Sequence, residues 1–182
     1  DFSATAEDIE NGNITGEHGD VYELRLHSTN PASSLTGKFL DAWAEKVNNA
    51  SNGELKISVY HGGALGTSEE TVDMIINGVC DIGWGLQTLF PERFPLSEVI
   101  SLPLMGFDSS VHSNKVFWDL YENNEALQDE YKDFKVILLH TNSGAPLMTK
   151  SKRINSVDDF SGLKIRVVGG STIDFVQQLN AN

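Results

Sequence analysis

One arginine in the sequence stands where a charged side chain is costly to bury. Arg166 lies in the segment 163–168, which is apolar except for Arg166 and Lys164 and is therefore typical of a buried strand. A buried guanidinium needs a carboxylate partner, which either the protein or a ligand can supply. A glycine pair follows, and Ser171 is placed to cap a helix whose first N–H groups attract anions. The segment predicts a small anion site centred on Arg166, and an internal ion pair with Asp or Glu explains the same pattern equally well.

Residues that commonly carry catalysis or bind metals do not assemble into a motif. The histidines lack the His-x-x-x-His or glutamate-adjacent spacing of a zinc site, so we expect no metal and no cofactor. The glycine-rich stretch 61–66 lacks the lysine of a P-loop and the dinucleotide-binding spacing, and it is interpreted as a turn. Because no nucleophile–base pair can be built from the motifs, we expect that the protein is not an enzyme.

Composition limits the kinds of partner. The chain has 182 residues, 40% of them hydrophobic, and a net charge of −13, which argues against binding to nucleic acid. No stretch of about 18 apolar residues is present to cross a membrane, and the single cysteine, Cys80, allows no intrachain disulfide framework. No signal-peptide pattern opens the sequence, which leaves a cytosolic protein and a removed signal both open. A local arginine can oppose the overall negative field, so an anionic ligand is still compatible with this composition.

The first half of the sequence predicts alternating strands and helices. Residues 1–20 are polar and acidic and are interpreted as a flexible leader. After them the hydrophobic periodicity predicts strands at 22–26, 55–59 and 81–84, with helices at 34–49 and 67–77 between them. We expect the first helix to be capped by Ser33 or Ser34 and to turn Leu35, Phe39, Ala42, Trp43 and Val47 inward.

This order predicts a parallel sheet with a ligand crevice beyond the carboxyl ends of its strands. The loops that follow the strands carry Thr29, Asn30, Trp84 and Gln87, which are candidate ligand contacts. For the three polar residues, ordinary turn chemistry is the competing interpretation.

The second half predicts further helices and strands. The periodicity favours helices at 109–122 and 125–131 and a one-turn helix after Ser156. The continuous apolar run at 134–139 predicts a strand that is buried on both faces. Two more strands are expected, one beginning at Leu147 and the other at 162–168, and a last helix from Thr172 toward Leu179.

Several segments, in this order, resemble the solute-binding proteins of tripartite ATP-independent periplasmic (TRAP) transporters, of the dicarboxylate-binding type. The most specific of them is Gly162-Leu-Lys-Ile-Arg166, and the likeness covers the chain from about Tyr22 onward. The other segments that carry it are Leu24–Val47, Gly63-Ala-Leu-Gly66 with the acidic helix ending Asn77-Gly-Val-Cys-Asp81, Ser101-Leu-Pro-Leu104, and Ser156–Val167.

The resemblance implies an α/β fold of the periplasmic-binding-protein kind, with two α/β domains around a cleft that closes on an organic acid. We expect an N-terminal domain at 21–144 and the start of a second domain at 145–182, which is incomplete because family members continue well beyond this point. The family arginine that matches Arg166 pairs with the ligand carboxylate. The implied function is periplasmic capture of an organic carboxylate and its delivery to the membrane subunits of a TRAP transporter. A ligand-sensing module of a signalling system is the alternative.

Two positions depart from the sialic-acid-binding branch of that family. Pro146 stands where that branch has an arginine, and Leu86 stands where it has a glutamate. The pocket is therefore expected to be less polar, with Trp84 lining it, and to suit a monocarboxylate with an apolar or aromatic body. The residues predicted to contact the ligand are Arg166, Trp84, Gln87, Thr29, Asn30, Pro146 and Ser171.

Overall fold

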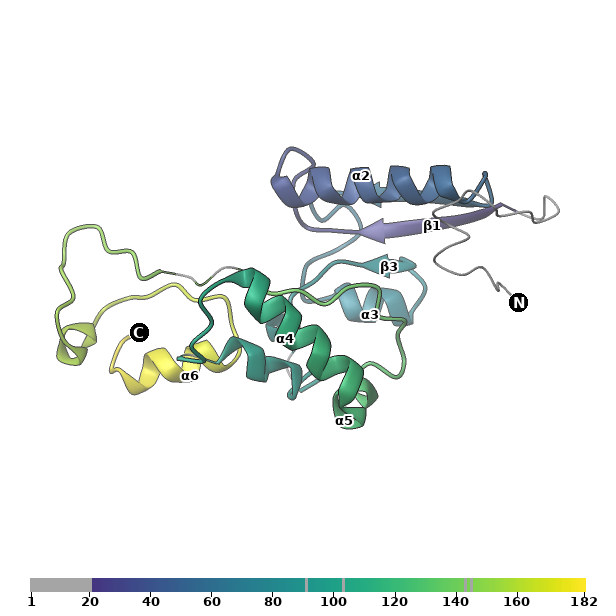
Figure 1. Ribbon diagram of the computed structural model, residues 1–182. Coiled ribbons are helices and arrows are strands. Elements are labelled where there is room, and N and C mark those ends of the chain that lie inside the picture. The colour runs from purple at the N-terminus through teal and green to yellow at the C-terminus, as the bar shows by residue number, and fades with distance from the viewer. Residues whose placement is uncertain (1–20, 91, 103, 143, 145) are drawn as a thin grey trace. The chain divides into compact units, whose positions relative to one another are not determined.

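The structure is a computed structural model that describes residues 21–90, 92–102, 104–142, 144 and 146–182 (Figure 1). The expected leader at 1–20 lies outside the described residues. The chain forms two compact units, one ending at Leu86 and the other beginning at Gln87. The domain boundary expected at 144/145 stays a prediction.

The first unit is built on a parallel sheet of three strands, as the sequence predicts. β1 (Tyr22–His27), β2 (Leu55–Tyr60) and β3 (Ile82–Gly83) are arranged in the order β2-β1-β3, and both pairings are parallel. α2 (Leu35–Ala50) lies along one side of the sheet and α3 (Thr71–Ile76) lies on the other side (Figure 1). Leu26 of β1 is opposite Val59 of β2 and Ile82 of β3, so the centre of the core lies beside β1.

α2 begins where the sequence predicts, but it turns a different face to the sheet. The side chain of Ser34 accepts a hydrogen bond from the Gly37 N–H at 3.0 Å, which confirms Ser34 as the cap. Leu40 and Ala44 are buried against the sheet. Leu35 is 87% exposed, and Phe39 and Ala42 are also exposed, so the inward positions expected for these three are wrong. Trp43 and Val47 are partly buried against the core, as predicted. At the start of the helix, Gly37 packs against the preceding loop, where an added Cβ would lie only 2.3 Å from the Pro31 carbonyl oxygen. The face that is buried is therefore the one that carries Gly37, Leu40 and Ala44.

α3 starts later than predicted and ends where predicted. The Glu70 carboxylate accepts hydrogen bonds from the N–H of Thr67 at 2.8 Å and from its hydroxyl at 3.0 Å, yet the helix begins only at Thr71. At the other end, the N–H of Gly78 donates to Ile75 and the N–H of Val79 donates to Met74, with Gly78 at φ 67°. This is a Schellman motif, in which glycine adopts the left-handed conformation without a steric penalty.

The second unit consists mainly of helices joined by irregular segments. Its helices are η1 (Gln87–Leu89), η2 (Ser97–Ser101), α4 (Ser110–Asn123), α5 (Glu125–Asp129), η3 (Val157–Phe160) and α6 (Ser171–Gln178). The helices predicted at 109–122 and 125–131, and the one-turn helix after Ser156, are confirmed.

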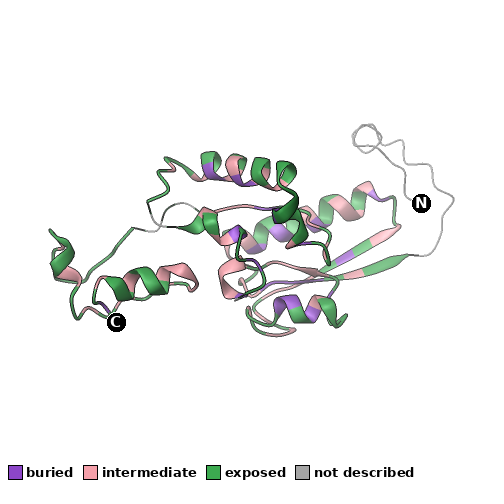
Figure 2. Cartoon of the chain, turned by 90° about the horizontal axis from the view of Figure 1, so that it is seen from below, coloured by how far each residue is buried: buried purple, intermediate pink, exposed green. Residues whose placement is uncertain are grey.

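The three strands predicted for this unit are wrong, because no strand is assigned within its described residues. In place of burial on both faces, Ile137 is 53% exposed and Leu138 is 50% exposed. Figure 2 shows the segments next to the C-terminus as mostly exposed. A strand needs a neighbour for its backbone hydrogen bonds. Here the backbone pairing is short. Asn182 accepts from the Ile165 N–H and donates to the Leu163 carbonyl, each at 2.7 Å, and the Gly162 N–H donates to the Asn180 carbonyl at 2.8 Å.

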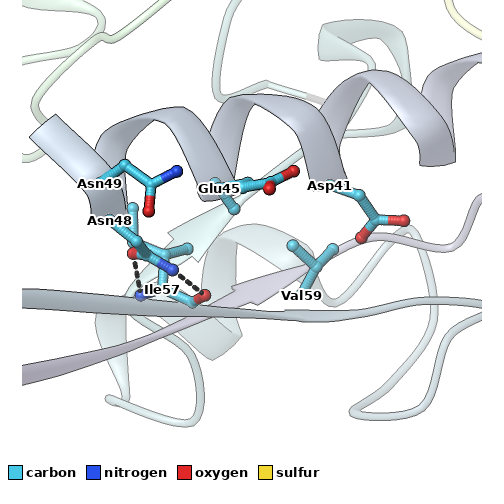
Figure 3. A pocket seen from close by; sticks show the side chains of 7 residues that line it. Asp41, Glu45, Asn48, Asn49, Ile57 and Val59 are labelled. Carbon is cyan, nitrogen blue, oxygen red and sulfur yellow. Dashed lines mark hydrogen bonds between the residues drawn. The ribbon is translucent and has the colours of Figure 1, made fainter.

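Side chains from the end of α2 occupy the outer edge of β2. Asn48 accepts a hydrogen bond from the Ile57 N–H at 2.7 Å and donates to the Ile57 carbonyl at 3.1 Å (Figure 3). Ser51 accepts from the Leu55 N–H at 3.1 Å. Exposed edge strands readily pair with other chains, so these side chains both hold the helix to the sheet and block part of the edge.

We predict that Asn48→Ala destabilises the protein by about 1–3 kcal/mol, because it leaves the N–H and C=O of Ile57 without their partner. Urea denaturation followed by circular dichroism measures the change. Asn49→Ala is the matched control, since Asn49 is the exposed neighbour on the same helix and should change stability by less than about 0.5 kcal/mol. Equal effects of the two substitutions would contradict this role of Asn48.

Candidate functional site

The parallel register of the first unit brings Thr29 and Asn30 against the glycine-rich loop. The Thr29 hydroxyl lies 2.8 Å from the Ser68 hydroxyl, and the Asn30 carbonyl accepts from the Gly62 N–H at 3.0 Å. The Asn30 side chain donates to the Ser28 hydroxyl at 3.2 Å. These contacts join the two loops at the carboxyl ends of β1 and β2. They also show that both predicted ligand residues already take part in local turn hydrogen bonds.

Trp84 lies at the carboxyl end of β3, the position predicted from the sequence. Its backbone N–H donates to the His27 carbonyl at 3.0 Å, which ties it to β1. Its half-buried ring packs against the ring of Phe39 with a centroid separation of 5.8 Å. The indole is therefore held at the strand end beside the core of the unit.

His27 is a buried residue of this region that the sequence interpretation did not use. Its side chain is fully buried, and neither ring nitrogen has a hydrogen-bond partner among the described residues. Burial lowers the pKa of the His27 imidazole, against the smaller opposing effects of the Thr67 carbonyl and the Glu70 carboxylate. In the sequence, His27 directly follows the core residue Leu26, so strand alternation places the two side chains on opposite faces of the sheet. A single histidine forms no motif, so the sequence alone does not indicate that its imidazole is buried.

In the second unit, a chain of polar side chains fixes Gln87. Its side-chain amide lies 3.5 Å from the Tyr131 hydroxyl, which is 2.6 Å from the Ser97 hydroxyl. The Glu130 carboxylate accepts from the hydroxyl of Ser97 at 2.8 Å and from its N–H at 3.0 Å. Burial raises the pKa of the Tyr131 phenol. This network fastens η1 and η2 to the residues that follow α5.

The glycine pair before α6 packs directly on η1 and η2. An ideal Cβ on Gly169 would lie 3.2 Å from the Thr88 carbonyl oxygen, and one on Gly170 would lie 3.1 Å from a carboxylate oxygen of Glu98. Gly170, at φ 59°, is the N-cap of α6, so the prediction of Ser171 as the cap is wrong by one residue. A glycine tolerates this left-handed conformation, which lets the helix start at Ser171. The Ser171 hydroxyl oxygen is buried and has no partner among the described residues.

Arg166 is exposed, and the burial predicted for it is not observed. Within the described part of the chain, no ion pair involves its guanidinium, so the internal ion pair that was the alternative interpretation is absent there. Pro146 is also exposed. The second unit thus brings the regions of Gln87 and Ser171 together through Thr88 and Gly170, with Arg166 on the segment leading into them.

A cavity of about 310 Å³ lies elsewhere, between α2 and β2 (Figure 3). Its polar walls include Asp41, Glu45 and Asn48, and it contains none of the predicted ligand residues. No group of three or more potential metal ligands occurs within the described ranges. None of the helices described is long and apolar enough to cross a membrane.

A family profile matches most of the chain. The profile of bacterial extracellular solute-binding protein family 7 covers residues 26–182. A sialic acid-binding periplasmic protein of Vibrio cholerae is 27% identical over 126 residues, which make up 68% of this chain and 38% of that protein.

Solved structures show the same fold. A TRAP solute-binding protein from an unidentified marine microbe, specific for aromatic acids and bound to 3-hydroxybenzoate, is 30% identical with a TM-score of 0.82. The match covers 90% of this chain and 51% of that one. A TRAP solute-binding protein from Rhodoferax ferrireducens with copurified benzoate is 27% identical with a TM-score of 0.79, over 88% of this chain and 50% of that one. The chain therefore spans about half the length of these relatives.

We predict that acid destabilises the protein in part through His27. Because the folded-state pKa of His27 is lowered below its unfolded value of about 6.5, the unfolded chain binds the proton more readily. This contribution to stability is complete above about pH 6.5 and is lost as the pH falls below it. Thermal melting between about pH 7.5 and pH 5 should therefore show a smaller loss for His27→Phe than for the wild type.

His112→Gln is the control for this measurement. His112 is an exposed histidine on α4, 3.1 Å from the Asp108 carboxylate, so its replacement shows whether the loss of any histidine would flatten the pH dependence, and we expect that it does not. A His27→Phe protein with the wild-type pH dependence would contradict the assignment.

Proposed function

The chain belongs to bacterial extracellular solute-binding protein family 7, and we propose that it captures a small organic carboxylate in the periplasm and delivers it to the membrane subunits of a TRAP transporter. The solved relatives have two α/β domains, and this chain matches about half of their length. The work proposed is capture, closure and release, without a chemical step.

The observation that carries this proposal is the state of Arg166. Its guanidinium has no ion pair within the described ranges, so its charge is available to a ligand. The segment that bears it leads into α6, whose first residue, Ser171, has a buried hydroxyl without a partner in the described part of the chain. A carboxylate can accept two parallel hydrogen bonds from a guanidinium and a further one from a hydroxyl, and its negative charge is favoured at a helix N-terminus.

The proposed ligand is a monocarboxylate with an apolar or aromatic body. Trp84 presents a half-buried aromatic ring at the carboxyl end of β3, and Pro146 and Leu86 replace polar residues of the sialic-acid-binding branch. Two relatives at 30% and 27% identity were solved with 3-hydroxybenzoate and benzoate, which supports this class.

We predict that Arg166→Ala and Arg166→Lys each weaken the binding of benzoate by at least tenfold, measured by isothermal titration calorimetry. Lysine keeps the positive charge but loses the planar pair of N–H donors that matches a carboxylate, so the substitution is not conservative. Tenfold corresponds to about 1.4 kcal/mol, which is close to the lower end of the range expected for a charged hydrogen bond.

Arg153→Ala is the matched control, because Arg153 is another exposed arginine of the same unit and should not affect binding. Native mass spectrometry of the purified protein gives an independent test, since a copurified acid should be present in the wild type and lost in Arg166→Ala. Unchanged benzoate binding in Arg166→Ala would refute the role of Arg166. Tighter binding of sialic acid than of benzoate would refute the ligand class.

A further inference from the structure

Glu98 is a charged residue beside the predicted ligand region to which no role has yet been given. It lies on η2 and is half-buried, with a carboxylate oxygen 3.1 Å from the ideal Cβ position of Gly170. The side chain of Thr88 lies 3.2 Å from the same point. The carboxylate therefore stands next to the N-cap of α6, beside Ser171 and the η1 segment that begins with Gln87.

The position of Glu98 is set by its neighbours on η2. The Glu130 carboxylate accepts hydrogen bonds from the N–H groups of Leu96 and Ser97, and the Ser97 hydroxyl also contacts Tyr131. This anchoring leaves little freedom to the backbone that carries Glu98. Its own carboxylate has no salt bridge or hydrogen bond among the described residues, although the adjacent helix N-terminus attracts negative charge.

We propose that Glu98 is a specificity-determining residue that selects acids with a single carboxylate and an O–H or N–H donor on the body of the ligand. This inference rests on the proposed function, because it assumes that a ligand carboxylate binds near Arg166 and Ser171. A donor on the ligand supplies the hydrogen-bond partner that the Glu98 carboxylate lacks. The first carboxylate of the ligand is balanced by the positive charge of Arg166. A second carboxylate beside Glu98 has no cation to balance it and is repelled, since two like charges a few ångströms apart interact strongly in a partly buried site.

Three benzene derivatives that differ in one substituent test the inference. Benzoate carries no second group, 3-hydroxybenzoate adds a donor, and benzene-1,3-dicarboxylate adds a second charge. Calorimetric titration of the wild-type protein should show about tenfold tighter binding of 3-hydroxybenzoate than of benzoate, with the dicarboxylate weakest. In Glu98→Gln the preference for the hydroxyl should fall below about threefold, and the dicarboxylate should gain about tenfold relative to benzoate.

Two further variants separate the possible roles of Glu98. Glu92→Gln makes the same charge change at an exposed position before η2 and should leave all three affinities in their wild-type ratios. Glu98→Asp keeps the charge and withdraws the carboxylate, so it should still disfavour the dicarboxylate while losing the preference for the hydroxyl. Because Glu98→Asp keeps the charge beside α6, it also serves if Glu98→Gln fails to fold.

The outcomes distinguish this inference from the proposed function. If the acids bind and their affinity ratios are the same in the wild type and in Glu98→Gln, the inference is overturned and the proposed function stands. If Glu98→Gln lowers the melting temperature but leaves the affinity ratios unchanged, the inference is also overturned, since Glu98 then only stabilises α6. If none of the three acids binds to the wild-type protein, the proposed function fails and the inference fails with it.

Discussion

The first unit depends on the pairing of β1 with a parallel strand on each side. β1 pairs along its whole length with β2, and its end pairs with β3. Because parallel strands end at the same edge of a sheet, this ladder delivers Thr29, the glycine-rich loop and Trp84 to one edge. It also places His27 at the end of the central strand, where the imidazole is buried without a partner among the described residues. A buried polar group of this kind costs stability.

The second unit has no such ladder within its described residues, and polar side chains connect its elements instead. Glu130 satisfies the N–H groups at the start of η2, and the buried hydroxyl of Tyr131 extends this network toward Gln87. Phe94 stacks on the Tyr131 ring with centroids 4.7 Å apart, so the polar network lies against an aromatic cluster. A satisfied polar network of this kind specifies geometry more than it adds stability.

Charge is distributed locally in a way that the net charge of −13 does not reveal. Arg166 is exposed, with no ion pair in the described ranges, and Glu98 stands beside the first turn of α6. A small anion can therefore find a favourable contact at Arg166 on a strongly acidic protein, because interactions at a few ångströms outweigh a field that salt screens within about 10 Å. Because Glu98 is negative, the affinity is expected to depend on how many negative charges the ligand carries.

Periodicity and turn chemistry in the sequence determined much of the first unit, including the parallel sheet, the Ser34 cap and the stop at Gly78. These features depend on contacts within a few residues or on patterns that repeat along the chain. The family was recognised because a short specific motif ending at Arg166 occurred together with other segments in order.

Tertiary structure alone decided which face of α2 is buried, where α6 begins, and that the segment with Arg166 does not form a strand here. A strand exists only when a neighbour pairs with it, and an apolar segment carries no information on whether that neighbour is present. The positions of His27 and Glu98 were also decided by packing, because a single ionisable residue has no motif. Its burial depends on residues distant in sequence, such as Gly170, whose missing side chain lets α6 approach η2.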